Sequence, residues 1–111
     1  VIKKGEHGSL LVTRPNDRQD AGPTQNVCSL PAYPATEVRD PTGAGDSFAG
    51  GMMGYLASAG EYDFQHLIRA MAYGTVTASF AIEDFGLRRF GRLSIDEIDR
   101  RLREYHDMLT F

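Results

Sequence analysis

The sequence has a single cysteine, Cys28, and no tryptophan. One cysteine cannot form an internal disulfide, which is typical of a protein in a reducing compartment, and we expect a cytoplasmic location. No apolar run approaches the ~20 residues that a membrane-spanning helix needs, and no signal peptide is recognisable. These absences argue against a disulfide-built secreted domain and against a membrane partner. Cys28 is interpreted as a small core residue rather than a reactive thiol, because no His or Lys near it in sequence would activate it.

Excess charge is also scarce. The formal net charge is −3, and the acidic and basic residues are interspersed without a basic tract, which argues against a nucleic-acid partner. Hydrophobic residues make up 41% of the chain and charged residues 24%, both ordinary for a soluble globular protein. With 111 residues, the chain is one small domain with a modest core.

The most informative stretch is Asp40-Pro41-Thr42-Gly43-Ala44-Gly45-Asp46-Ser47-Phe48-Ala49-Gly50-Gly51. Its first two residues predict a turn. The Gly-Ala-Gly that follows lets the backbone turn tightly and approach a ligand closely. From Asp46 the apolar spacing predicts a helix to about Ala59, with Gly60 as its C-cap. The glycine-rich turn then lies at a helix N-terminus, which favours binding of an anion such as a phosphate.

Asp46 has two interpretations. Its negative charge at the helix N-terminus would stabilise the helix, with no further role. Alternatively, its carboxylate takes a proton from a hydroxyl group as that hydroxyl attacks a phosphoryl group. The stretch is not a Walker-type phosphate loop, because no Gly-Lys-Ser/Thr follows it.

The same stretch resembles the second signature of the PfkB/ribokinase family of sugar and nucleoside kinases, in which an Asp, a Thr, then Gly-Ala-Gly-Asp and Phe recur at these spacings. The resemblance implies that Asp46 is the catalytic base and that the amides of Gly43, Ala44 and Gly45 form the anion hole. It also implies a monovalent-cation site, for K⁺, that starts at Asp40 and Thr42. The phosphoryl donor would be ATP with Mg²⁺, and the acceptor a small-molecule sugar or nucleoside.

The resemblance covers only the C-terminal part of such a kinase. The chain opens with Val1-Ile2-Lys3-Lys4-Gly5 and has no initiator Met. We therefore expect residues 1–111 to be the nucleotide-binding and catalytic part of a longer kinase, truncated at its N-terminus. The lid, most sugar contacts and the family's Asn-x-x-Glu motif would lie upstream. The expected fold class is α/β, as the C-terminal part of a ribokinase-like, three-layer Rossmann-type sandwich.

Several elements are predicted from local patterns. Residues 1–13 read as strand, turn and strand, and residues 27–33 as a short strand that Pro31 ends or confines to an edge. Asp63 is expected to cap a helix over residues 64–83. Ser94 and Glu97 form a capping box before a terminal amphipathic helix. The apolar face of that helix is expected to comprise Ile95, Ile98, Leu102, Tyr105 and Leu109.

Three glycines inside the signature helix, Gly50, Gly51 and Gly54, would each cost the helix about 0.5–1 kcal/mol relative to alanine. They therefore predict close packing against a neighbouring element. One face of the following helix is also rich in small residues, which favours close contact between helices.

The resemblance also implies nucleotide contacts outside the signature, at Gly5, Gly8, Val76, Ser79 and Gly86. For the first two, a plain hairpin turn is a compatible alternative. For the residues of the second helix and the loop after it, the alternative is helix packing alone.

Two further interpretations of the whole chain remain open. It could be a nucleotide-binding module or inactive fragment, because the acceptor-binding half is missing. It could also be a structural fragment that pairs with another chain, for example as a homo-oligomer, through an open sheet edge.

Overall fold

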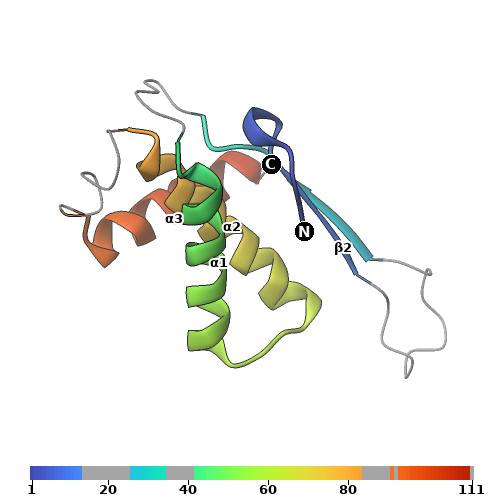
Figure 1. Cartoon of the computed structure of the whole chain (residues 1–111). Coiled ribbons are helices and arrows are strands. Elements are labelled where there is room, and N and C mark those ends of the chain that lie inside the picture. Colours follow the sequence, from blue (N-terminus) through green and yellow to red (C-terminus); the bar gives the residue numbers. More distant parts are fainter. Residues whose placement is uncertain (14–25, 35–41, 84–90, 92, 111) are drawn as a thin grey trace, which may run out of the picture.

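The computed structural model describes residues 1–13, 26–34, 42–83, 91 and 93–110 (Figure 1). In chain order, the elements are β1 (Ile2–Lys3), the 3₁₀ turn η1 (Gly5–His7), β2 (Ser9–Thr13), β3 (Asn26–Leu30), α1 (Ala44–Ala59), α2 (Phe64–Ala81) and α3 (Ile95–Leu109). The three strands form an antiparallel sheet in the order β1-β2-β3. The three helices lie to one side of this sheet, so the fold is α/β (Figure 1).

The predicted strand–turn–strand is confirmed at the N-terminus. β1 pairs with β2 in the register Ile2 opposite Leu10. The η1 turn is closed by the Lys4 N–H, which donates to the Gly8 carbonyl at 2.7 Å. Gly8 has a φ of 93°, and a Cβ atom there would lie 2.2 Å from the Leu30 carbonyl oxygen. Only glycine fits this position, because both the conformation and the space exclude a side chain.

Helix α1 begins at Ala44, two residues before the expected start at Asp46. Gly43 precedes it with a φ of 84°, a left-handed conformation that glycine adopts without strain. The predicted C-cap is confirmed: Gly60 has a φ of 69°, and its N–H donates to the Leu56 carbonyl at 3.0 Å. The Gly-Ala-Gly turn is thus partly inside the helix, which brings the backbone of Ala44 and Gly45 into its first turn.

Helix α2 begins where the sequence predicts, because the Asp63 side chain accepts a hydrogen bond from the His66 N–H at 2.9 Å. The helix ends at Ala81, two residues before the expected end. Close contact with α1 is confirmed for Gly51, where a Cβ atom would lie 2.5 Å from Thr77 Oγ1 and 3.0 Å from the Tyr73 carbonyl oxygen. The prediction of close packing is wrong for Gly50 and Gly54, where a Cβ atom would meet nothing within 4 Å.

The core lies between the sheet and the helices and is formed by Leu11, Leu30, Phe48, Met71, Val76, Phe80 and Tyr105. Strand β3 ends at Leu30, and Pro31 follows it as predicted. Cys28 is partly buried against this core, and burial raises the pKa of its thiol. The interpretation of Cys28 as a packing residue therefore agrees with its position.

The Ser94 cap of α3 is confirmed, because Ser94 Oγ accepts from the Glu97 N–H at 3.2 Å. The predicted apolar face is correct only in the middle of the helix. Tyr105 is 2% exposed, whereas Ile95 is 71% exposed. Leu109 is exposed as well. The middle of α3 packs on the core, and its two ends extend beyond it.

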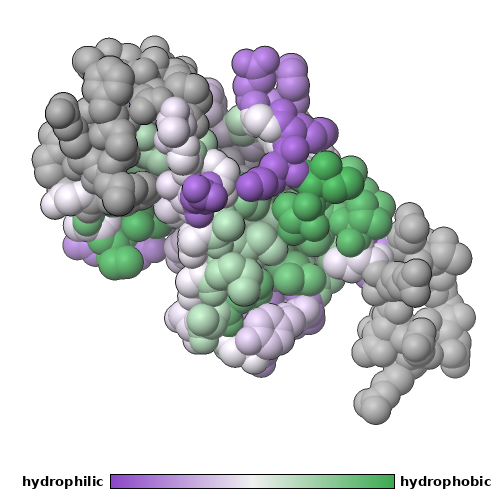
Figure 2. All heavy atoms as spheres, viewed as in Figure 1, coloured by the Kyte–Doolittle hydropathy of each residue, from purple (hydrophilic) through white to green (hydrophobic). Residues whose placement is uncertain are grey.

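The outer face of the sheet is apolar and uncovered within the described residues. Ile2, Val12 and Val27 are all exposed there, beside the half-buried Leu10. Figure 2 shows apolar side chains gathered over the strands. A helical layer on this face is not found in the described part of the chain, so the three-layer sandwich stays a prediction. No helix of that part is long and apolar enough to cross a membrane.

Candidate functional site

A cavity of about 650 Å³ opens between the η1 turn, the segment after β3, the start of α1 and the C-terminal half of α2. Its walls are mostly apolar. The lining residues are Lys3, Gly5, Glu6, Gly8, Ser9, Ala32, Tyr33, Pro34, Ala44, Gly45, Phe48, Thr75, Ala78, Ser79 and Ile82. Four segments that are distant in sequence therefore meet around one space large enough for a nucleotide-sized molecule.

One end of the cavity is positively charged. Lys3 Nζ donates a hydrogen bond to the Gly45 carbonyl at 3.3 Å and lies 5.9 Å from the centre of the Phe48 ring. The first hydrogen bond within α1 runs from the Ser47 N–H to the Gly43 carbonyl at 2.9 Å, so the amides of residues 44–46 have no acceptor within the helix. An ammonium group and a helix N-terminus thus lie together, which favours an anionic ligand group there.

Another part of the wall is apolar and aromatic, with Tyr33, Ala78 and Ile82 among its members. Ser79 lies in the same wall, and its hydroxyl group donates to the Val76 carbonyl at 2.5 Å. It also accepts a hydrogen bond from Arg101 Nη1 at 3.1 Å. The Ser79 hydroxyl is therefore held in place from behind by α3.

Five of the residues proposed from the sequence lie around this one cavity: Gly5, Gly8, Ala44, Gly45 and Ser79. They come from the hairpin, α1 and α2, so the fold brings together residues up to 74 positions apart, as counted from Gly5 to Ser79. Whether they bind a nucleotide stays a prediction.

The other proposed residues lie elsewhere. Thr42, Gly43 and Asp46 are exposed at the start of α1 and are not among the lining residues. Val76 is fully buried in the core, so its side chain is not available to a ligand in this conformation. Asp40 and Gly86 lie outside the described residues.

Sequence reasoning missed Lys3, Tyr33 and Arg101. Lys3 stands two residues before Gly5 in a short strand, and no local pattern predicts that its amine reaches Gly45. Tyr33 follows the end of β3 and becomes part of the wall only when α2 packs beside it. Such contacts depend on tertiary packing, which periodicity and spacing do not encode.

The cavity suits a nucleoside triphosphate in its charge pattern. The cationic end fits phosphate groups, and the apolar wall fits a flat base. The missing side chain of Gly45 leaves space beside the amine of Lys3, because a Cβ atom there would lie 3.0 Å from Lys3 Nζ. Among the described lining residues, Glu6 is the one carboxylate, so these residues alone form no evident magnesium site.

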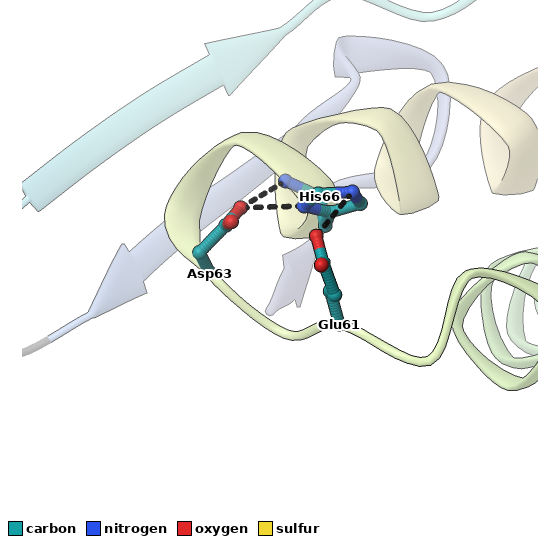
Figure 3. Close-up of side chains that lie close together, drawn as sticks. All are labelled: Glu61, Asp63 and His66. Carbon is teal, nitrogen blue, oxygen red and sulfur yellow. Dashed lines mark hydrogen bonds and ion pairs between the residues drawn. The ribbon is translucent and has the colours of Figure 1, made fainter.

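A separate cluster of potential metal ligands lies at the other end of the α1–α2 pair (Figure 3). His66 Nδ1 lies 2.7 Å from Asp63 Oδ1, and His66 Nε2 lies 3.2 Å from Glu61 Oε2. Hydrogen bonds from the backbone and ring of His66 hold the pKa of the Asp63 carboxyl below its ordinary value. Both ring nitrogens already face carboxylates, so the cluster is explained as the N-terminal cap of α2.

Comparison with known proteins places the chain in a family. Residues 1–91 match the profile described as the pfkB family carbohydrate kinase. The chain is also similar to the uncharacterized protein C16C9.01c of Schizosaccharomyces pombe, with 32% identity over 123 aligned positions. That match covers 99% of this chain and 33% of the yeast protein, so the chain spans about a third of the length of this relative. The chain belongs to the pfkB family of carbohydrate kinases.

Proposed function

We propose that the chain carries the ATP-binding and catalytic part of a kinase that transfers the terminal phosphoryl group of ATP to a hydroxyl group of a sugar. A nucleoside is the alternative acceptor. The observation that carries the proposal is the position of the Gly43–Gly45 turn. It starts α1 at the cationic end of a cavity of about 650 Å³, beside Lys3.

In the proposed reaction, Asp46 accepts the proton of the acceptor hydroxyl group as the oxygen attacks the terminal phosphorus of ATP. The bond between that phosphorus and the oxygen of the leaving ADP breaks. The amides of Gly43, Ala44 and Gly45 donate to the phosphoryl oxygens, where negative charge increases. Exposure of Asp46 supports this role, because an acceptor can approach it from the solvent side of α1.

Two ions belong to the proposal. Mg²⁺, when bound together with ATP, would supply positive charge that offsets the charge of the phosphates. A monovalent cation beside Asp40 and Thr42 would order the turn before α1. Thr42, one of these two candidate ligands, lies in the turn that leads into α1.

The test of the catalytic role is Asp46→Asn in the full-length kinase. The amide cannot accept the proton, so turnover should fall by about 10²–10⁴-fold, the range of general base catalysis. Binding of an ATP analogue should stay within twofold of the unchanged protein. A variant with near-full turnover would rule out the base role of Asp46, and Asp63→Asn serves as a control for a carboxylate remote from the cavity.

A nucleotide-binding module without catalysis is the second candidate. It is favoured by the position of Asp46, which lies at the start of α1 and is not among the residues that line the cavity. Calorimetric titration of the chain with a non-hydrolysable Mg·ATP analogue, with and without K⁺, tests the site itself. A panel of sugars and nucleosides with ATP then separates the two candidates, because only the kinase turns over.

The three-layer sandwich is also a proposal. The apolar outer face formed by Ile2, Val12, Val27 and the half-buried Leu10 would be covered by helices from elsewhere in a kinase as long as the yeast relative. Concentration-dependent mass of the chain in solution would instead indicate that a second copy covers this face. A monomer whose outer face binds no hydrophobic dye would contradict both arrangements.

A further inference from the structure

Arg101 of α3 is held between two aromatic rings behind the cavity. Its guanidinium carbon lies 3.6 Å from the centre of the Phe80 ring and 5.0 Å from the centre of the Tyr33 ring. Arg101 Nη1 also donates to Glu83 Oε1 and, at 3.1 Å, to Ser79 Oγ. The Arg101 side chain is only 20% exposed. These contacts fix the guanidinium in one place, because stacking and paired hydrogen bonds act together.

The partners of Arg101 lead directly to the cavity. Tyr33 and Ser79 both line it, whereas Arg101 does not. The Tyr33 hydroxyl group donates to Glu104 Oε2 at 3.3 Å, so α3 holds the ring at a second point. Arg101 lies over the Tyr33 ring, and the centre of the Tyr105 ring lies 6.3 Å from the centre of the Tyr33 ring. Since Tyr33 still lines the cavity, part of its ring faces the space inside.

Tyr33 belongs to the apolar wall, while the ammonium group of Lys3 and the first turn of α1 form the charged end. A ligand with phosphates at one end and a flat aromatic group at the other fits both. An aromatic side chain braced by a cation is a suitable surface on which a base can stack.

We propose that Tyr33 is the surface on which the base of the nucleotide stacks, and that Arg101 is a positioning residue that holds Tyr33 and Ser79 in the wall. The proposal rests on the proposed function, because it assigns the base end of the same cavity. Helix α3 lies beyond residues 1–91, the part that matches the family profile. Arg101 therefore lies outside the matched residues, while Tyr33 and Ser79 lie within them.

The test compares two ligands, a non-hydrolysable Mg·ATP analogue and Mg·tripolyphosphate, which has the phosphates but no base. Tyr33→Ala and Arg101→Ala should each weaken binding of the ATP analogue about tenfold, the scale of one base–aromatic stack, and leave binding of tripolyphosphate unchanged. Tyr33→Phe keeps the ring and loses only the bond to Glu104, so it should bind the analogue nearly as the unchanged chain does. Arg103→Ala, at an exposed position of α3, is the matched control for loss of an arginine.

The ratio of the two affinities separates positioning from damage to the fold. If Arg101→Ala lost the same fraction of its affinity for the ATP analogue and for tripolyphosphate, Arg101 would have a general structural role and the proposal would be overturned. Full affinity of Tyr33→Ala for the ATP analogue would overturn it as well, while leaving the proposed function intact. Failure of the unchanged, folded chain to bind either ligand would instead reject the proposed site, and the base surface with it.

Discussion

The contact between α1 and α2 makes opposite predictions for two glycines of the same helix. Gly51 faces α2, where a Cβ atom would lie 2.5 Å from Thr77 Oγ1, 2.9 Å from Thr77 Cβ and 3.0 Å from the Tyr73 carbonyl oxygen. Gly54 is exposed, and a Cβ atom there would meet nothing within 4 Å. Replacing each with alanine adds the same methyl group to the same helix, so the two variants differ only in what this group meets.

The magnitudes follow from that difference. In Gly54→Ala, the helix gains about 0.5–1 kcal/mol from the lower conformational entropy of alanine in the unfolded chain. Gly51→Ala has the same gain, but the added methyl group overpacks the interface at a cost of about 1–3 kcal/mol. Thr77 could turn its hydroxyl group away only by giving up its 2.7 Å hydrogen bond to the Tyr73 carbonyl, and that carbonyl is backbone. We therefore expect Gly54→Ala to be more stable than the unchanged chain and Gly51→Ala to be less stable.

Urea unfolding followed by circular dichroism measures both variants against the unchanged chain. The free-energy difference between the variants should be about 1–3 kcal/mol, and the dependence on urea should stay the same. Gly50→Ala is the control, because its added methyl group also meets nothing within 4 Å. Equal stability of Gly51→Ala and Gly54→Ala would refute the close approach of α1 and α2 at Gly51.

Three further predictions concern single side chains. Lys3→Met should weaken binding of an Mg·ATP analogue about fivefold in a calorimetric titration, as expected for loss of one exposed charge contact, while Lys4→Met, one position along, should not. Asp63→Ala should lower the melting temperature at neutral pH, because His66 holds the pKa of the Asp63 carboxyl in the folded chain below its ordinary value of 3.8. The difference in melting temperature should be present above pH 3.8 and should vanish as the pH falls through the lower pKa of the folded chain. Tyr105→Phe should cost about 0.5–1.5 kcal/mol in urea unfolding, because the part-buried hydrogen bond of 2.6 Å from the Tyr105 hydroxyl group to the Pro31 carbonyl is lost. Burial also raises the pKa of Tyr105 to about 12, so the unchanged chain should lose stability as pH rises from 10 to 12, and Tyr105→Phe should lose less.

The parts of the fold that sequence predicts well are those that local chemistry determines. Asp63 and Ser94 begin helices because their side-chain oxygens accept from backbone N–H groups three positions on, and both contacts are present. Gly60 ends α1 because its left-handed conformation costs no steric strain. Each of these signals needs only a few neighbouring residues, so it can be recognised without the rest of the structure.

The parts that sequence predicts poorly depend on which surfaces meet. Ile95 has the same helical spacing as Ile98, yet it is 71% exposed because the core does not reach the first turn of α3. Gly50 and Gly51 are neighbours in the same helix, but of these two glycines only Gly51 faces α2. Periodicity states which residues share a helix face, and it does not state where the neighbouring element begins or ends.

The candidate site shows the same division. Spacing located the turn of Gly43, Ala44 and Gly45 and placed it at a helix N-terminus, because a recurring motif depends on local backbone geometry. Both residues that distinguish the two ends of the cavity, Lys3 and Tyr33, come from outside that motif. Their positions arise from the hairpin and from the packing of α3 against Tyr33, which sequence patterns alone do not relate to the turn.

Three glycines of the signature stretch have physically different surroundings within this one chain. Gly43 needs a positive φ to start α1, and Gly51 needs the absence of a side chain to let α2 approach. Gly45 is different again, because the nearest atom to an added Cβ is the flexible Lys3 amine rather than backbone. Since that amine can move, the fold itself would tolerate a side chain at Gly45, whereas Thr77 and the Tyr73 carbonyl oxygen block one at Gly51.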